Sequence, residues 1–414
     1  MIIDKKNPAT TPAFFSEDYF ESFASNHSWE PEWLADLRKE SWATLQEDEL
    51  VSLKDERWRF SPKSRLGYSH FKSISESSNS INFDHASGSP QNILNTIDNI
   101  LLDNSDLIAD FAEIQGPNLG APQSNHLTNT YFTNGFFLKV SGIQNQKLHL
   151  LVKHTCPEER FVTFHKNYVI LDDFTEVTLV ENFISENDFS RGGLSNLTHI
   201  KIGKGAKLNR ILIQNMAEGT SFHNLENFDL HADSLVVNVQ CHLGANQSRI
   251  ETKGNLWEPG ANFENFSFVS GRGKQLFDQR TEQYHFAPQC SSNLLAKNVL
   301  QDEAKSIFAG LIKVDPKAQQ TNALQTNRNL LLSRDAEADS LPGLEILAND
   351  VSCTHGATTS RLNQEELFYL LSRGIEKKSA ESLISLGFLE EIIGKIQDEE
   401  LTQRIREMVY THFK

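Results

Sequence analysis

The chain has 414 residues, of which 38% are hydrophobic and 23% charged, and its formal net charge is −16. This composition is typical of a globular protein with one sizeable core and smaller attachments. The acidic excess argues against nucleic acid as a partner, because binding to phosphates depends on Lys and Arg. The first twelve residues lack the apolar core of a signal peptide, and no apolar run approaches the ~20 residues that span a bilayer. We therefore expect a cytoplasmic protein without membrane contact.

The N-terminal part predicts helices. Pro31 opens the segment 31–45, whose leucines recur at helical spacing. A Ser/Asn-rich stretch at 73–92 has the composition of a surface loop, and a second helical pattern follows at 93–114.

From about Leu127 the apolar period changes from helical to two. Short segments rich in β-branched and aromatic residues follow at 131–140, 147–154, 177–183, 197–216, 233–243 and 262–271. Small residues recur at corner-like points, with irregular spacing: Gly205-Ala206, Ala232, Gly244-Ala245 and Gly260-Ala261. Many short strands separated by small turn residues favour a β-solenoid, and a two-layer β-sandwich is the alternative.

The end of the chain is helical again. Asn363 followed by Glu366 resembles a capping box, Gly374 ends that helix, and amphipathic segments follow at 380–396 and 399–413. We therefore predict a mainly β protein with helical flanks. Its parts are an N-terminal helical region with a Ser/Asn-rich loop (1–125), a β core (126–350) and a small C-terminal helical domain (351–414).

Several chemistries are absent from the sequence. Gly203-Lys204 and Gly273-Lys274 lack the rest of a P-loop, so we expect no nucleotide bound by this chain. Asp172 and Asp173 are adjacent, and on a strand they would point to opposite faces, so we interpret them as a turn. The four cysteines, Cys156, Cys241, Cys290 and Cys353, form no C-x-x-C pair, so a metal site would need ligands from distant segments or another chain.

Cys353 and His355 lie in the stretch DVSCTHGATTSRL, residues 350–362. On an extended segment residues i and i+2 share a face, so a thiolate and an imidazole could reach one soft metal such as iron or zinc. The alternative is a half-buried cysteine and a hydrogen-bonded histidine at a strand end. His154 and Cys156 have the same spacing, and the residues alone leave the choice open.

The segment 344–375 resembles the C-terminal signature of SufD subunits of the Suf iron–sulfur cluster assembly machinery. The resemblance rests on an acidic residue, the run CTHGAT and a helix that ends in SRGI. It extends through 277–333 and, more loosely, to 131–140, 55–60 and 30–42. The paralogous SufB subunit is the alternative within the family, and SufB-like chains carry a sequence resembling LEHEAT at this position.

The resemblance implies a right-handed parallel β-helix between helical flanks. It implies a non-catalytic scaffold that pairs with a SufB-like subunit through the β-helix ends and docks the ABC-type ATPase SufC through the C-terminal helical domain. His355 matches the family's functional histidine, and Cys353 a nearby cysteine, at a site for a transient iron–sulfur cluster shared with SufB. The resemblance also implies a flavin at the level of the whole complex, and no residue of this sequence is assigned to it.

Two further hypotheses belong to other classes. A β-helix enzyme acting on polysaccharide would turn over an acidic polysaccharide, and a stand-alone metal protein would hold one iron or zinc per chain. Cys156, Cys241 and Cys290 are expected to be core or surface residues in every case.

Overall fold

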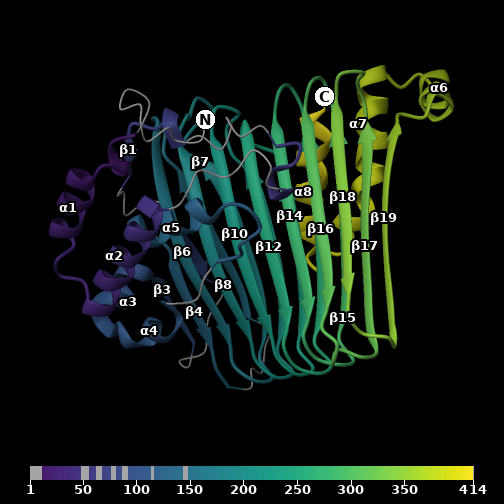
Figure 1. The fold of residues 1–414 in the computed structure, drawn as a ribbon. Coiled ribbons are helices and arrows are strands. Elements are labelled where there is room, and N and C mark those ends of the chain that lie inside the picture. Colours follow the sequence, from purple (N-terminus) through teal and green to yellow (C-terminus); the bar gives the residue numbers. More distant parts are fainter. Residues whose placement is uncertain are drawn as a thin grey trace.

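The computed structural model describes residues 12–47, 56–61, 68–75, 81–85, 92–112, 116–142 and 148–413. Its centre is a β-solenoid in which the chain alternates between two parallel sheets (Figure 1). Even-numbered strands from β4 to β18 form one sheet, called sheet A, and odd-numbered strands from β5 to β19 form the other, called sheet B. This arrangement confirms the solenoid and excludes the β-sandwich.

Each coil of the solenoid adds one strand to each sheet. The strands of sheet A are β4 Phe136–Val140, β6 Phe161–Leu171, β8 Gly193–Ile202, β10 Ser221–Leu230, β12 Gln247–Leu256, β14 Leu276–His285, β16 Lys305–Val314 and β18 Glu337–Ile346. The strands of sheet B are β5 Leu148–Cys156, β7 Glu176–Ser185, β9 Lys207–Asn215, β11 Leu235–His242, β13 Asn262–Gly271, β15 Ser291–Leu300, β17 Thr321–Leu331 and β19 Val351–Arg361.

The corner from sheet A to sheet B has the same backbone conformation in six successive coils. One residue in each corner has a positive φ, between 55° and 78°: Phe174, Gly205, Asp233, Gly260, Gln289 and Gln320. The corners also hydrogen-bond to one another, and the amide of Gly205 donates to the carbonyl of Ala232 at 2.8 Å. Glycine adopts this conformation without strain, which explains the two glycines. The other four positions are not glycine, so the repeat is weak in the sequence.

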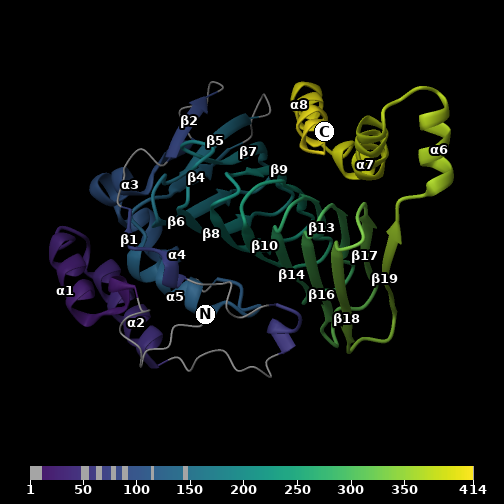
Figure 2. The same ribbon diagram turned by 90° about the horizontal axis from the view of Figure 1, so that it is seen from above.

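The N-terminal region packs at the start of the solenoid and across sheet A (Figures 1 and 2). Its helices are α1 Glu17–Asn26, α2 Glu32–Glu47, α3 Ile97–Asn104, α4 Asp106–Ala112 and α5 Pro122–Tyr131, with short 3-10 turns η1 Ala13–Phe15, η2 Glu56–Trp58 and η3 Tyr68–His70. Helix α2 confirms the prediction for 31–45. Arg38 of α2 is buried, and it bonds Glu30 as well as the carbonyls of Thr130 and Phe132.

Two predictions for this region need correction. The helical pattern at 93–114 begins with strand β3, Ile93–Thr96, because these residues pair with β4 before α3 starts. The loop predicted at 73–92 contains strands β1, Ser73–Ile74, and β2, Ile81–His85, which extend sheets A and B. Residues 76–80 and 86–91 of that loop, like residues 1–11, lie outside the described residues.

The C-terminal helices are α6 Gln364–Ser372, α7 Lys377–Ile393 and α8 Glu399–His412. Helices α7 and α8 pack against sheet B, where Leu389 and Ile405 share a core cluster with Ile211 and Phe266 (Figure 2). Asn363 caps α6, as predicted, by accepting from the amide of Glu365 at 2.9 Å. None of the helices in the described ranges is both long and apolar enough to cross a membrane.

Candidate functional site at the open end of the solenoid

Strand β19 forms the last coil of the solenoid. It pairs with β17 and, within the described residues, with no strand on its other side. The strand runs to Arg361, whereas the sequence placed the start of the helical domain at residue 351. Cys353 and His355 therefore belong to the end of the β-helix, and their side chains are placed by the register of β19 on β17.

Both side chains lie on the inward-facing side of this coil. Cys353 is in register with Ala323 and His355 with Gln325, and both β17 residues are buried in the solenoid interior. Alternate residues of a strand share a face, so Cys353 and His355 stack above these two positions. The structure thus confirms that the two side chains share a face.

The two residues differ in their surroundings. Cys353 is partly buried against Ile312, Val314 and Ala348, whereas His355 is exposed because no further coil covers it. Burial raises the pKa of the Cys353 thiol, although the backbone of Ala323 opposes this shift. The thiol is therefore protonated at neutral pH in the isolated chain.

Two side chains of the kinds that bind metals lie side by side here, fewer than a complete metal site needs. Cys353 and His355 provide one sulfur and one nitrogen, which suit iron or zinc. Within the described part of the chain, no group of three or more His, Cys, Asp or Glu residues could hold a metal ion.

The second His-x-Cys pair has no such access. His154 and Cys156 of β5 are fully buried, and His154 lies 3.0 Å from His165 and 3.2 Å from Glu181. Burial lowers the pKa of His154 and raises that of the Cys156 thiol. Cys241 and Cys290 are also buried in core clusters. The structure therefore separates two pairs that the sequence could not.

Charged residues inside the solenoid were missed by the sequence reasoning. Arg210 is fully buried and bonds Glu181 at 2.6 Å and Glu226 at 2.7 Å. Glu226 also accepts from Gln240 and Thr252. No sequence signal marks these residues, because charges at alternating positions of a strand normally indicate its solvent face.

Alternate residues of β19 point their backbone groups to the open edge, where no described strand pairs with them. Leu362 donates its amide to Leu331, and Asp350 accepts at its carbonyl from Gln320, so even-numbered residues face β17. Because backbone groups of successive strand residues point to opposite sides, the odd-numbered residues, including Cys353 and His355, face outward. Between Val351 and Ser360 this edge carries no Asp, Glu, Lys or Arg.

Comparisons with known proteins identify the family of the chain. Residues 154–388 match the family model described as SUF system FeS cluster assembly, SufBD core domain. The chain is 30% identical over 286 residues to the iron–sulfur cluster assembly protein SufD of Escherichia coli (strain K12), an alignment that covers 68% of this chain and 67% of that protein.

Two further relatives are similar over shorter spans. Identity to SufD of Bacillus subtilis (strain 168) is 29% over 243 residues, which is 58% of this chain and 56% of the relative. Identity to a SufBD family protein of Synechocystis is 30% over 270 residues, which is 63% of this chain and 59% of the relative. The family model covers more than half of the chain, and it ends beyond the CTHGAT segment. The chain therefore belongs to the SufBD family of iron–sulfur cluster assembly proteins and is of the SufD type.

Proposed function

We propose that this chain is a non-catalytic scaffold subunit of a cytoplasmic iron–sulfur cluster assembly complex. It pairs with a SufB-like subunit through the open end of its solenoid and contributes His355, with Cys353 beside it, to a shared assembly site. Iron and sulfide are cargo that the site holds transiently. The observation that carries this proposal is strand β19, whose open edge has no charged residue from Val351 to Ser360 and whose inward face presents Cys353 and His355.

The chemistry of β19 supports a strand-pairing partner. Edge strands that remain free in solution are usually protected by charges, prolines or bulges. Strand β18 has such protection, since it carries Pro342 and the acidic residues Glu337, Asp339 and Glu345. Between Val351 and Ser360, strand β19 has neither a proline nor an Asp, Glu, Lys or Arg. A strand of the partner would satisfy its outward amides and carbonyls and would cover His355.

Shared ligation explains why this chain supplies only two candidate ligands. Iron–sulfur clusters are held mainly by thiolates and sometimes by imidazoles, and each iron needs several ligands. A partner that brings the remaining ligands makes assembly depend on the complex. Enclosure by the partner would also remove water from around the cargo.

Iron and acid-labile sulfide in the complex test the site. The chain is co-expressed with its SufB and SufC partners as wild type, as His355→Ala and as Thr354→Ala. Thr354 is the matched control because its side chain points to the opposite face of the same strand. We expect His355→Ala to purify as an intact complex with little iron and sulfide, and Thr354→Ala to load normally. Equal loading of all three would remove His355 from the site.

A proline in the open edge tests the pairing. Ala357 is odd-numbered, so its amide faces outward, and Ala357→Pro removes that donor without breaking a bond to β17. We expect less SufB-like partner to co-purify with Ala357→Pro, while the side-chain control Ala357→Ser keeps it. Undiminished co-purification of a folded Ala357→Pro chain would show that the partner does not pair with this edge.

Helix α6 supports the docking of an ATPase subunit. Unlike α7 and α8, it projects away from the solenoid (Figure 2), and its Phe368 and Tyr369 are 71% and 57% exposed. An apolar helix surface of this kind fits a partner groove. Phe368→Ser should abolish co-purification of SufC, whereas Phe189→Ser, at an even more exposed phenylalanine, should not. Retention of SufC by Phe368→Ser would move the docking surface elsewhere.

A further inference from the structure

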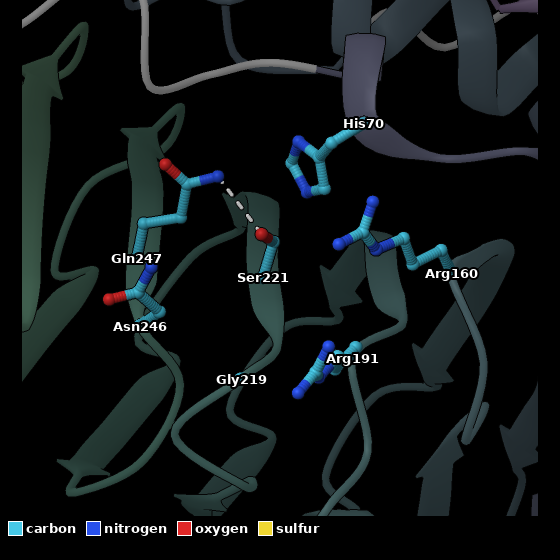
Figure 3. Close-up of a pocket in the computed structure, with 7 residues that line it drawn as sticks. All are labelled: His70, Arg160, Arg191, Gly219, Ser221, Asn246 and Gln247. Carbon is cyan, nitrogen blue, oxygen red and sulfur yellow. Dashed lines mark hydrogen bonds between the residues drawn. The ribbon is translucent and has the colours of Figure 1, made fainter.

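A polar pocket of about 430 Å³ lies far from the open end, where four neighbouring strands of sheet A begin. Its lining comes from the residues before or at the starts of β6, β8, β10 and β12, and η3 of the N-terminal region contributes His70. The lining residues are His70, Arg160, Arg191, Gly219, Ser221, Asn246 and Gln247. Figure 3 shows His70 and Arg160 directed toward the space in front of Ser221, with Arg191 below Arg160.

The two arginines occupy equivalent places in consecutive coils. Val162 pairs with Gly193, and Arg160 and Arg191 each lie two residues ahead of that pair. The amide of Arg191 donates to the carbonyl of Glu158 at 2.7 Å, so the two loops lie against each other. Backbones of neighbouring strands are about 4.8 Å apart, and like charges in register at this separation repel each other.

Within the described residues, neither arginine has a carboxylate as a direct partner. No carboxylate forms an ion pair with either guanidinium in the described part of the chain, and none belongs to the lining. Two nearby acidic groups pair elsewhere, since Glu159 lies 3.4 Å from Lys72 and Glu218 lies 2.8 Å from Arg272. Unbalanced positive charge in one pocket is notable in a chain whose net charge is −16.

The remaining lining groups include side chains that can donate hydrogen bonds. Gln247 donates its side-chain amide to the hydroxyl of Ser221 at 2.9 Å, which leaves the hydroxyl hydrogen for a ligand. Desolvation and the positive charge of Arg160 lower the pKa of His70, consistent with the two side chains facing the same space. A guanidinium group can donate two parallel hydrogen bonds to two oxygens of one phosphate, and neutral donors add further directional hydrogen bonds.

We propose that this pocket binds the phosphate group of a small molecule, either free diphosphate or a phosphate ester. Two arginines in register recognise the dianionic group, and the Ser221 hydroxyl orients it. The pocket is larger than a single phosphate, and volumes of this order hold a ligand with a substituent. Such a site is separate from the open end and does not depend on the function proposed above.

Isothermal titration of the full-length chain at constant ionic strength tests the proposal. The probes are pyrophosphate and ADP, with sulfate as a reference anion, and the variants are Arg160→Gln and Arg191→Gln. Arg334→Gln is the matched control, because it removes an equal charge from an exposed arginine outside the pocket. Because a hydrogen bond to a charged group contributes strongly to binding, we expect each pocket variant to raise the dissociation constant about tenfold or more.

The outcomes separate the sources of the phosphate. Pyrophosphate binding as tight as that of ADP, lost in both pocket variants and kept in Arg334→Gln, supports recognition of the phosphates alone. Tighter binding of ADP with the same loss supports a nucleotide-type ester. Binding no stronger than that of sulfate, or binding that survives in both folded pocket variants, overturns the proposal.

Discussion

Replacement of Arg210 by methionine is expected to destabilise the solenoid strongly. The guanidinium lies between Glu181 and Glu226 at 2.6 Å and 2.7 Å, and all three side chains are fully buried. Methionine has a similar length but no charge, so Arg210→Met leaves two buried carboxylates without their cation. Removal of one partner of a buried pair costs about 3–5 kcal/mol, and with two carboxylates affected we expect the upper part of this range at pH 7.

The pH dependence of this loss has a defined sign. Burial alone would raise the pKa of Glu181, but Arg210 and His154 outweigh it and lower the pKa to about 2. In the wild type this carboxylate therefore stabilises the fold above its ordinary pKa of 4.5, and the contribution is lost as the pH falls toward 2. Without Arg210, burial raises the pKa of Glu181, and the variant gains relative stability when this carboxylate takes up a proton. The gap between variant and wild type should shrink from pH 7 to pH 5.

Urea denaturation followed by circular dichroism at pH 7 and pH 5 measures this gap. Arg328→Met is the matched control, because Arg328 forms an exposed ion pair with Glu391 and should cost less than about 1 kcal/mol. A loss below about 1 kcal/mol for Arg210→Met at pH 7, or an equal loss at both pH values, would refute the reasoning.

Three further outcomes are expected. Iodoacetamide should label Cys353 alone among the four native cysteines, and peptide mass spectrometry should find no second labelled cysteine before unfolding. Because burial raises the pKa of the Cys353 thiol and the thiolate is the reactive form, labelling should become faster as the pH rises. Gly135→Ala should destabilise the chain by about 3 kcal/mol or more, because Gly135 has a φ of 147° and an added Cβ would collide with the carbonyl of Lys166. An unchanged urea midpoint would contradict this expectation. Leu389→Ala should lower the free energy of unfolding by about 2–5 kcal/mol, and the exposed control Leu383→Ala by under about 1 kcal/mol. Equal urea midpoints for the two variants would argue against packing of α7 on sheet B.

The sequence pattern predicted sheet B better than sheet A. The segments 147–154, 177–183, 233–243 and 262–271 correspond to β5, β7, β11 and β13, whose apolar residues alternate clearly. Strands β6, β10, β12 and β14 were not identified. In β12 and β14 the outward face carries charged residues that are buried beneath the N-terminal region. Arg249 bonds Asp278 at 2.5 Å and the carbonyl of Leu119 at 3.0 Å, so polar residues occupy both faces and the alternation is lost.

The sequence by itself determined the helical flanks, the many short strands, the shared face of Cys353 and His355, and the CTHGAT signature of the family. Only the tertiary structure decided which of the two cysteine–histidine pairs is accessible. His154 and Cys156 are buried within the solenoid, whereas β19 is the last strand of its sheet and leaves His355 exposed. The physical reason is that spacing along a strand is a local property, whereas exposure and charge compensation depend on the coil that stacks next to it.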